Sequence, residues 1–206
     1  MRPGEVGLEL SSHSGTGAPA YLRLGVEHIL SGPDHLLFVL GLLLLARLRK
    51  LFFVITAFTL AHSLTLALTS VGWISLASGP VELMIAVSIL LLAVEAIRVI
   101  DGQPSFTAER PWLVSFGFGL LHGFGFAGAL SEIGLPAGAE LMALFYFNVG
   151  VELGQLLFIG VLLILAFIMT RILKARMVNV RRIATYGLGI AGAFWVFERA
   201  SGLFIT

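Results

Sequence analysis

The sequence predicts an all-α, polytopic membrane protein with six transmembrane helices preceded by a short half-helix. Three observations lead to this class: an apolar fraction of 58%, a charged fraction of only 12% and a mean hydropathy of +0.99. A soluble domain carries roughly 25% charged residues, so this chain cannot cover a globule with a solvated surface. Because a spanning helix needs about 20 apolar residues, the 206 residues allow about six spans.

The predicted elements follow one another with short connections. Residues 1–20 are polar and rich in Gly and Ser, and we expect them to form a flexible tail before a single transmembrane domain of residues 21–206. The break at Ser31-Gly32-Pro33 separates the stretch Tyr21–Leu30 as a half-helix, because proline favours a helix start. Six apolar segments long enough to span a bilayer follow: 33–48, 51–70, 80–100, 111–131, 141–168 and 183–204.

Lys and Arg residues gather in alternate connections between the predicted spans. Ten of the thirteen basic residues lie in or beside the first, third and fifth connections, whereas the second and fourth contain none. Cytoplasmic loops carry an excess of Lys and Arg. We therefore expect an integral protein of the bacterial inner membrane with both termini extracytoplasmic.

Two short segments recur along the chain. Phe58-Thr-Leu-Ala-His62 resembles Phe118-Gly-Leu-Leu-His122, and Gly79-Pro-Val-Glu82-Leu-Met resembles Gly138-Ala-Glu140-Leu-Met. Both copies would run in the same direction through the membrane. The sequence thus predicts a weak internal repeat of helix pairs, of the parallel type known in transporters.

Several chemistries are excluded by composition and motif. The chain contains no cysteine, which excludes a disulfide framework, thiolate metal sites and a cysteine nucleophile. It also lacks a glycine-rich phosphate loop of the Walker type, so we do not expect intrinsic coupling to ATP. The expected surroundings are the lipid bilayer, with no nucleic acid partner.

The densest group of ionisable residues surrounds the predicted break, and it consists of Glu27, His28, Asp34 and His35. An ionisable side chain at mid-membrane costs at least about 2.5–3.5 kcal/mol on insertion scales, so each needs a partner or a function. We expect the Ser31 hydroxyl to cap the helix that begins at Pro33. Asp34 then falls in the first turn, where the helix dipole favours a carboxylate.

Carboxylates within the spans outnumber the basic residues that could pair with them. Glu82, Glu95 and Glu152 join Asp34 in or beside the spans, so protons or a bound cation are expected to neutralise them. Glu95 shares a helix face with Ser88, and Glu82 fits either an ion path or a solvated helix start. Arg199 stands near the end of the last span, where we expect it to snorkel to the membrane surface.

Two further histidines and one polar stripe lie deep in the spans. His62 and His122 stand near the middle of their segments, where each could bind metal, handle protons or form a hydrogen bond between helices. Asn148, Glu152 and Gln155 fall at i, i+4 and i+7 and so form one stripe, which must face the bundle interior or a cavity. Imidazole with carboxylate oxygen suits Ni, Co, Zn or Fe.

Four motifs together resemble the HupE/UreJ family of membrane proteins. They are the segment Gly25–Leu40 with its His28 and Gly32-Pro-Asp34-His35, the segment Phe58–Thr65 with His62, the segment Phe116–Gly123 with His122, and the segment Phe147–Gln155 with Asn148 and Glu152. The resemblance implies a six-helix permease, a secondary transporter for a divalent transition metal, usually nickel. It also implies an ion path through these residues: His28, Asp34, His35, His62, His122, Asn148 and Glu152. We add a secondary path of Glu27, Glu82, Glu95 and Gln155. Many relatives carry proline directly after the first histidine, where this chain has Ile29.

Two other functions are compatible with the same residues. Three histidines and an acid could hold Zn²⁺ with an open position, as in an intramembrane zinc-dependent hydrolase. A metal-binding membrane subunit would need the same ligands without transport. We expect a transporter rather than an enzyme, with a homo-oligomer or a metal-delivery partner left open.

Overall fold

The computed structural model describes residues 17–133 and 139–204, with the side chains of 126–133 and of Phe204 excepted. The described residues form helices and their connections, with no β-strand among them, so the all-α prediction is confirmed for this part of the chain. The elements are α1 (Ala18–Ser31), α2 (Pro33–Leu45), α3 (Leu48–Ser70), α4 (Ser78–Ile100), α5 (Phe106–Glu109), α6 (Pro111–Ile133), α7 (Glu140–Phe167), the π-helix η1 (Ile168–Ile172) and α8 (Met177–Phe204). Most predicted spans match these helices to within a few residues. The largest difference is at α8, which begins six residues before its predicted span.

The predicted break between the half-helix and the first span is confirmed. α1 and α2 meet at 75° with Gly32 between them, and Asp34 lies in the first turn of α2. The expected cap is wrong, because Ser31 is still the last residue of α1. Its hydroxyl donates to the Glu27 carbonyl at 2.6 Å, the usual backward bond of a helical serine.

Length and composition identify the helices that can cross a membrane. Among the described residues, three segments pass: Leu48–Ser70, Ser78–Ile100 and Glu140–Ile172; the bent pair α1 and α2 counts as a fourth. α6 and α8 are helices of 23 and 28 residues. That these two also span, which would make six, stays a prediction.

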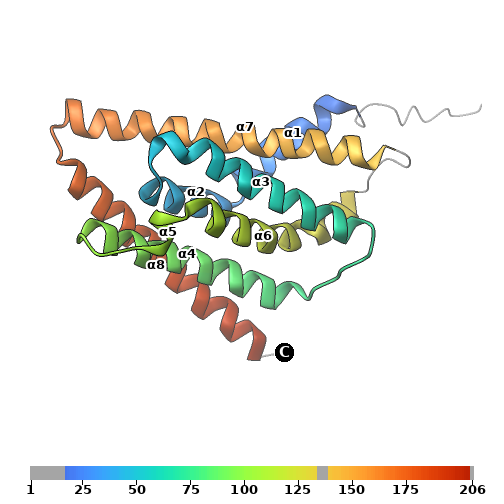
Figure 1. The fold of residues 1–206 in the computed structure, drawn as a ribbon. Helices are drawn as coiled ribbons and strands as arrows, with labels where there is room; N and C mark the ends of the chain where they lie inside the picture. Colours follow the sequence, from blue (N-terminus) through green and yellow to red (C-terminus); the bar gives the residue numbers. More distant parts are fainter. Residues whose placement is uncertain (1–16, 134–138, 205–206) are drawn as a thin grey trace, which may run out of the picture.

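The long helices lie side by side with their connections at two ends (Figure 1). α3 and α6 run in the same direction, whereas α4 and α7 run in the opposite one. The connections after α2, α4 and η1 lie at one end, which holds most of the Lys and Arg residues and is called the basic end below. α1 begins and α8 ends away from it. The parallel course of α3 and α6 agrees with the predicted repeat, which itself stays a prediction.

Glycines allow the closest approaches between helices. A Cβ added to Gly25 of α1 would collide with the Phe147 carbonyl of α7, and one added to Gly150 would collide with the Leu22 carbonyl. Gly123 of α6 packs in the same way on α3, against the His62 carbonyl and the Thr65 side chain. Small residues let backbones approach in a membrane protein. These contacts hold the histidine-bearing helices together.

Candidate metal centre

Four imidazoles from four helices converge in the middle of the bundle. His35 of α2 is central, with ring centroids 4.7 Å from His28 of α1, 5.0 Å from His122 of α6 and 6.0 Å from His62 of α3. His28 and His62 are themselves 5.9 Å apart. The close helix contacts and the 75° bend bring together residues separated by up to 94 positions in the sequence.

Hydrogen bonds fix how two of these rings are presented. His122 Nδ1 lies 2.8 Å from the Phe118 carbonyl, which can only accept, so Nδ1 carries the proton. His35 Nδ1 lies 3.1 Å from Asp34 Oδ1 and donates to that carboxylate in the same way when the ring is neutral. Metal-binding histidines typically donate one ring N–H to a carbonyl or carboxylate and bind the metal through the other nitrogen. In both rings that nitrogen is Nε2.

Those remaining nitrogens are buried without hydrogen bonds. Within the described part of the chain, Nε2 of His35, Nε2 of His122 and both ring nitrogens of His62 have no hydrogen-bond partner. His62 is 0% and His122 1% exposed. An unsatisfied buried polar group costs about 1–3 kcal/mol, and such groups call for a specific explanation. A cluster of free imidazole lone pairs suits a cation or water.

Asp34 supplies the carboxylate closest to the imidazoles. Its Oδ1 accepts from the His35 backbone N–H at 2.9 Å as well as from the ring. Its Oδ2 lies 3.6 Å from a guanidinium nitrogen of Arg199. The carboxylate is thus oriented by its own helix start and shared between a histidine and an arginine.

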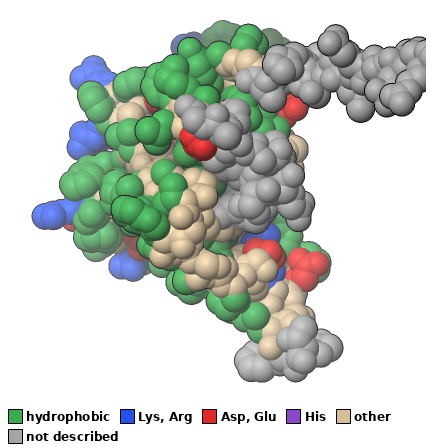
Figure 2. All heavy atoms as spheres, turned by 90° about the vertical axis from the view of Figure 1, so that its right-hand side faces the viewer, with side chains coloured by type: hydrophobic (Ala, Val, Ile, Leu, Met, Phe, Trp, Pro, Cys, Tyr) green, Lys and Arg blue, Asp and Glu red, His purple; other side chains and the backbone are tan. Residues whose placement is uncertain are grey.

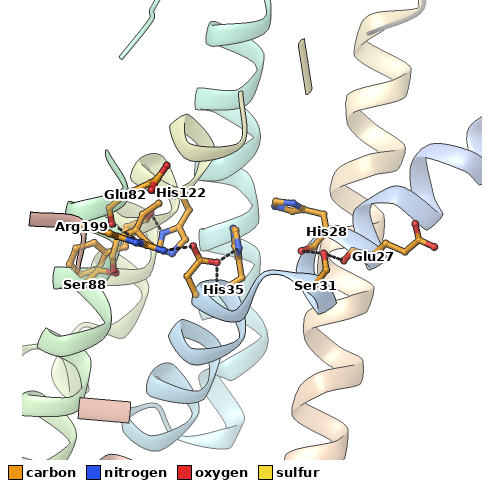
Figure 3. A network of polar contacts seen from close by, with 11 residues as sticks. Glu27, His28, Ser31, His35, Glu82, Ser88, His122 and Arg199 are labelled. Carbon is orange, nitrogen blue, oxygen red and sulfur yellow. Dashed lines mark hydrogen bonds and ion pairs between the residues drawn. The ribbon is translucent and has the colours of Figure 1, made fainter. Parts of the chain in front are cut away.

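Arg199 corrects two of the sequence predictions. Its side chain is only 18% exposed and turns inward from α8, so the prediction that it snorkels is wrong. It donates to the Glu82 carbonyl at 2.7 Å (Figure 3). It also lies over the Trp195 ring, 5.4 Å from the ring centroid. Arg199 therefore pairs with Asp34 inside the bundle, where protons or a bound cation were expected to neutralise this carboxylate. The physical reason is that a carboxylate, a carbonyl and an indole face together replace the water that a snorkelling side chain would seek.

A cavity of about 240 Å³ connects these groups. It is lined by His28, Ser31, Gly32, Asp34, His35, Glu82, Ile85, His122, Gly125 and Arg199. In Figure 2 most Lys and Arg side chains lie along one edge of the view, and a separate small group of acidic and basic side chains lies low on the face. The cavity is lined by the starts of α2 and α4 and the last turns of α8, away from the basic end.

A layer of phenylalanines lies on the other side of the imidazoles. Phe58 precedes His62 by one turn on α3, Phe118 precedes His122 by one turn on α6, and Phe38 follows His35 by one turn on α2. The Phe38 ring centroid lies 5.2 Å from that of Phe58 and 5.8 Å from that of Phe118. Because α2 runs opposite to α3 and α6, all three rings lie on the side of the imidazoles that faces the basic end. They separate the imidazoles from that end.

The polar stripe of α7, which was predicted to face the bundle interior or a cavity, contacts α3. Glu152 accepts a hydrogen bond from Thr56 at 2.6 Å, and Gln155 accepts one from Thr59 at 3.1 Å. Asn148 is 9% exposed and donates to the Leu144 carbonyl at 2.7 Å. We call this contact between α3 and α7 the polar seam. Because Thr56 and Thr59 lie within two residues of Phe58, the polar seam lies at the height of the phenylalanine layer and passes beside it.

Glu27 and Glu95 lie away from the imidazoles, whereas Glu82 lines the same cavity. Glu27 points outward, is 54% exposed and pairs with Arg23 at 2.6 Å (Figure 3). Glu95 lies near the basic end of α4, where it accepts from the Ser105 hydroxyl at 2.6 Å and from the Thr107 N–H at 3.2 Å. Glu82 lines the cavity, and its backbone carbonyl accepts from Arg199. Glu27 and Glu95 hold local structure.

The described residues contain no group of three or more His, Asp or Glu side chains in the geometry of a formed metal site. The imidazoles are gathered around a cavity rather than closed on one point.

Several residues of the site were not predicted. Arg199 could have been found from its place inside an apolar segment that also contains Trp195, four residues earlier. The phenylalanines leave a clear signal, since Phe-x-x-x-His occurs in both α3 and α6 and sets a phenyl ring one turn from each imidazole. Thr56 and Thr59 leave a weaker signal, six and three residues before His62.

One comparison with known proteins gives a match. The family described as HupE / UreJ protein matches residues 6–199, which is nearly the whole chain. No curated protein and no solved structure matches it.

Proposed function

The chain belongs to the HupE/UreJ family, and we propose that it is a secondary transporter, a permease, for a divalent transition-metal cation. The family and the apolar helices make it a membrane protein of a metal-transporter type. The observation that carries the proposal is the set of four imidazoles, two of which keep Nε2 free because Nδ1 is hydrogen-bonded. Nitrogen ligands with a carboxylate suit Ni, Co, Zn or Fe, and the family membership is the reason for proposing nickel first.

The proposed ion path begins at the cavity. A hydrated cation enters there and exchanges water for Asp34, His35 and His28, whose groups line the opening. It then passes to His62 and His122, which are almost fully buried. Because metal binding needs neutral imidazole, entry releases protons whenever the rings are protonated.

Beyond the imidazoles, the path follows the polar seam between α3 and α7. Asn148, Glu152 and Gln155 supply oxygen ligands beside the phenylalanine layer, which blocks the direct route. Passage therefore requires a rearrangement of the helices around the layer, as in alternating access. Glu82 belongs to the entrance, whereas the positions of Glu27 and Glu95 argue against a place in the path.

The charge distribution supports uptake. With the basic end in the cytoplasm, both termini and the cavity face outward across a bacterial inner membrane. A divalent ion that crosses a potential of 100 mV gains about 4.6 kcal/mol, which drives inward movement without ATP.

The test is metal flux into proteoliposomes that contain the purified full chain. We expect Ni²⁺ uptake above that of empty vesicles, and we expect His62→Ala to abolish most of it because a fully buried ligand is lost. Glu27→Gln is the control, since this neighbour of His28 points away from the cavity and should leave flux unchanged. Thermal unfolding of each variant establishes that it is folded.

Two outcomes would contradict the proposal. Flux equal to empty vesicles for every divalent metal would refute transport, as would unchanged flux in His62→Ala. One zinc ion per chain that stays bound through purification, together with absence of metal flux, would instead favour the intramembrane hydrolase.

A further inference from the structure

We propose that Arg199 is a tethered cation that neutralises Asp34 while the ion path is empty and is displaced when a divalent cation binds. This inference rests on the proposed function and assigns a positioning residue to its entrance. It makes the guanidinium a built-in competitor for the metal. The competition sets how tightly the entrance holds its cargo and which ions can enter.

The geometry places the guanidinium where an incoming cation must bind. Asp34 Oδ1 is already engaged by the backbone and ring nitrogens of His35. Oδ2 is the oxygen left for a cation, and it is the one that faces Arg199 at 3.6 Å. Both side chains line the same cavity, so a metal on Oδ2 and a guanidinium in its present position would be adjacent like charges.

The contacts of Arg199 allow it to leave Asp34 without losing all its partners. The 3.6 Å separation is longer than a charge-assisted hydrogen bond of about 2.7–2.9 Å. The stronger bond, at 2.7 Å, goes to the Glu82 carbonyl, and the guanidinium also lies over Trp195. A permanently charged group thus keeps a carbonyl and an aromatic face when the carboxylate is taken by metal.

Competition of this kind discriminates by charge. A tethered group acts at a high effective concentration, so a monovalent ion, which brings no more charge than the guanidinium, has little advantage over it. A divalent ion brings twice the charge and also binds the imidazole nitrogens of His35 and His122. The arginine is therefore expected to exclude monovalent cations and to keep divalent ones exchangeable.

The experiment compares Ni²⁺ binding to the full chain in lipid nanodiscs for wild type, Arg199→Gln and Arg23→Gln. Glutamine keeps a polar side chain that can form hydrogen bonds but carries no charge. We expect Arg199→Gln to bind Ni²⁺ at least about fivefold more tightly, the lower end of typical coupling between two sites. We also expect its binding to become sensitive to 200 mM Na⁺ compared with an equal osmolarity of sucrose, by about twofold or more. Arg23→Gln removes an exposed positive charge from the same end of the molecule and should match wild type.

The expected gain in affinity separates this role from a structural one, because a folding defect weakens binding. Unchanged or weaker Ni²⁺ binding by Arg199→Gln overturns the inference, provided that wild type binds. Equal tightening in Arg23→Gln also overturns it, since surface charge would then be the cause. If Arg199→Gln does not fold, Arg199→Lys replaces it in the experiment. The mobile lysine ammonium takes the place of the planar guanidinium, and we expect a Ni²⁺ affinity between those of wild type and Arg199→Gln. An affinity equal to or below that of wild type contradicts the inference. Absence of Ni²⁺ binding in wild type is a failure of the proposed function instead.

Discussion

At the residue scale, the site gathers buried polar atoms that have no hydrogen-bond partner among the described residues and that a bound cation would satisfy. His62 has two buried nitrogens without hydrogen bonds in the described structure, and Asn148 has a buried side-chain oxygen in the same state. His35 and His122 are held by one nitrogen and free at the other. Such unsatisfied groups are expensive in a fold that only needs stability. Their concentration in one place is therefore better explained by a cargo than by packing.

Glu152 gives a residue-scale prediction, because it is the first carboxylate along the seam beyond the imidazoles. Glu152→Gln keeps the shape and can still accept from Thr56, but it removes the charge. We expect Ni²⁺ binding at equilibrium to stay within about twofold of wild type, since the entrance groups are intact. Uptake into proteoliposomes should fall at least about tenfold, because a hydrogen bond or contact to a charged group contributes about 1.5–3 kcal/mol.

Glu95→Gln is the matched control for this experiment. Glu95 also accepts a hydroxyl hydrogen bond of 2.6 Å, but its donor is Ser105 near the basic end of α4. Its replacement should lower thermal stability slightly and leave uptake unchanged. Equal loss of uptake in both variants would mean that the seam is not part of the path.

The sequence was sufficient to predict the site residues that are unusual in an apolar segment. It was insufficient to predict those that are common there. His28, Asp34, His35, His62 and His122 stand out as ionisable groups in apolar segments, and the structure brings them together. The prediction for Arg199 was wrong because its position near the end of the predicted span is the same for an inward and an outward rotamer. Only the position of α8 beside α4 and α2 decides between the two.

At the element scale, the bend between α1 and α2 and the glycine contacts of α7 place the entrance. α1 packs along α7 through Gly25 and Gly150, whose missing side chains let the two backbones touch. The bend at Gly32 then turns α2 so that Asp34 and His35 face the histidines of α3 and α6. The position of His28 relative to His35 thus depends on the backbone contact between α1 and α7.

This contact gives an element-scale prediction with a control on the same helix. Gly150→Ala should destabilise the protein and weaken Ni²⁺ binding, because the added methyl group would collide with the Leu22 carbonyl and push α1 away. Gly160→Ala should be neutral or slightly stabilising, by up to about 1 kcal/mol, since nothing lies within 4 Å of its added Cβ and alanine favours a helix. Thermal unfolding and Ni²⁺ titration of both variants measure the difference. Equal behaviour of the two would show that the α1–α7 contact does not position the entrance.

The helices were predictable from the sequence, whereas the contacts between them were not. Long apolar segments with prolines or polar connections between them define helices to within a few residues in most cases. Which faces meet depends on shape at glycines such as Gly119 and Gly123, and the sequence gives no partner for a glycine. The Ser31 cap failed for a local reason, because α1 continued through that residue and used its hydroxyl internally.

At the scale of the whole molecule, the two ends of the bundle differ in charge and in access to the site. The cavity, the start of α1 and the last turns of α8 lie away from the basic end, and the phenylalanine layer separates the imidazoles from it. Among the described residues, the cavity therefore lies toward one end of the bundle, and the phenylalanine layer lies between the imidazoles and the other end. If the basic end is cytoplasmic, the site faces outward in this conformation, which is the state that accepts cargo for uptake.

Cysteine labelling tests this orientation and the number of crossings together. The chain has no native cysteine, so single substitutions report without background. Gly72→Cys lies in the connection between α3 and α4, whereas Gln103→Cys and Lys174→Cys lie in connections at the basic end. With six crossings and the basic end inside, a membrane-impermeant thiol reagent labels only Gly72→Cys in intact cells. The other two are labelled after permeabilisation, because Lys and Arg near their connections keep those segments in the cytoplasm.

The reverse pattern would invert the orientation and make the cavity an exit rather than an entrance. Labelling of Gln103→Cys and Lys174→Cys from opposite sides would instead mean that α6, α7 and η1 do not cross twice between them, which would rule out six spans.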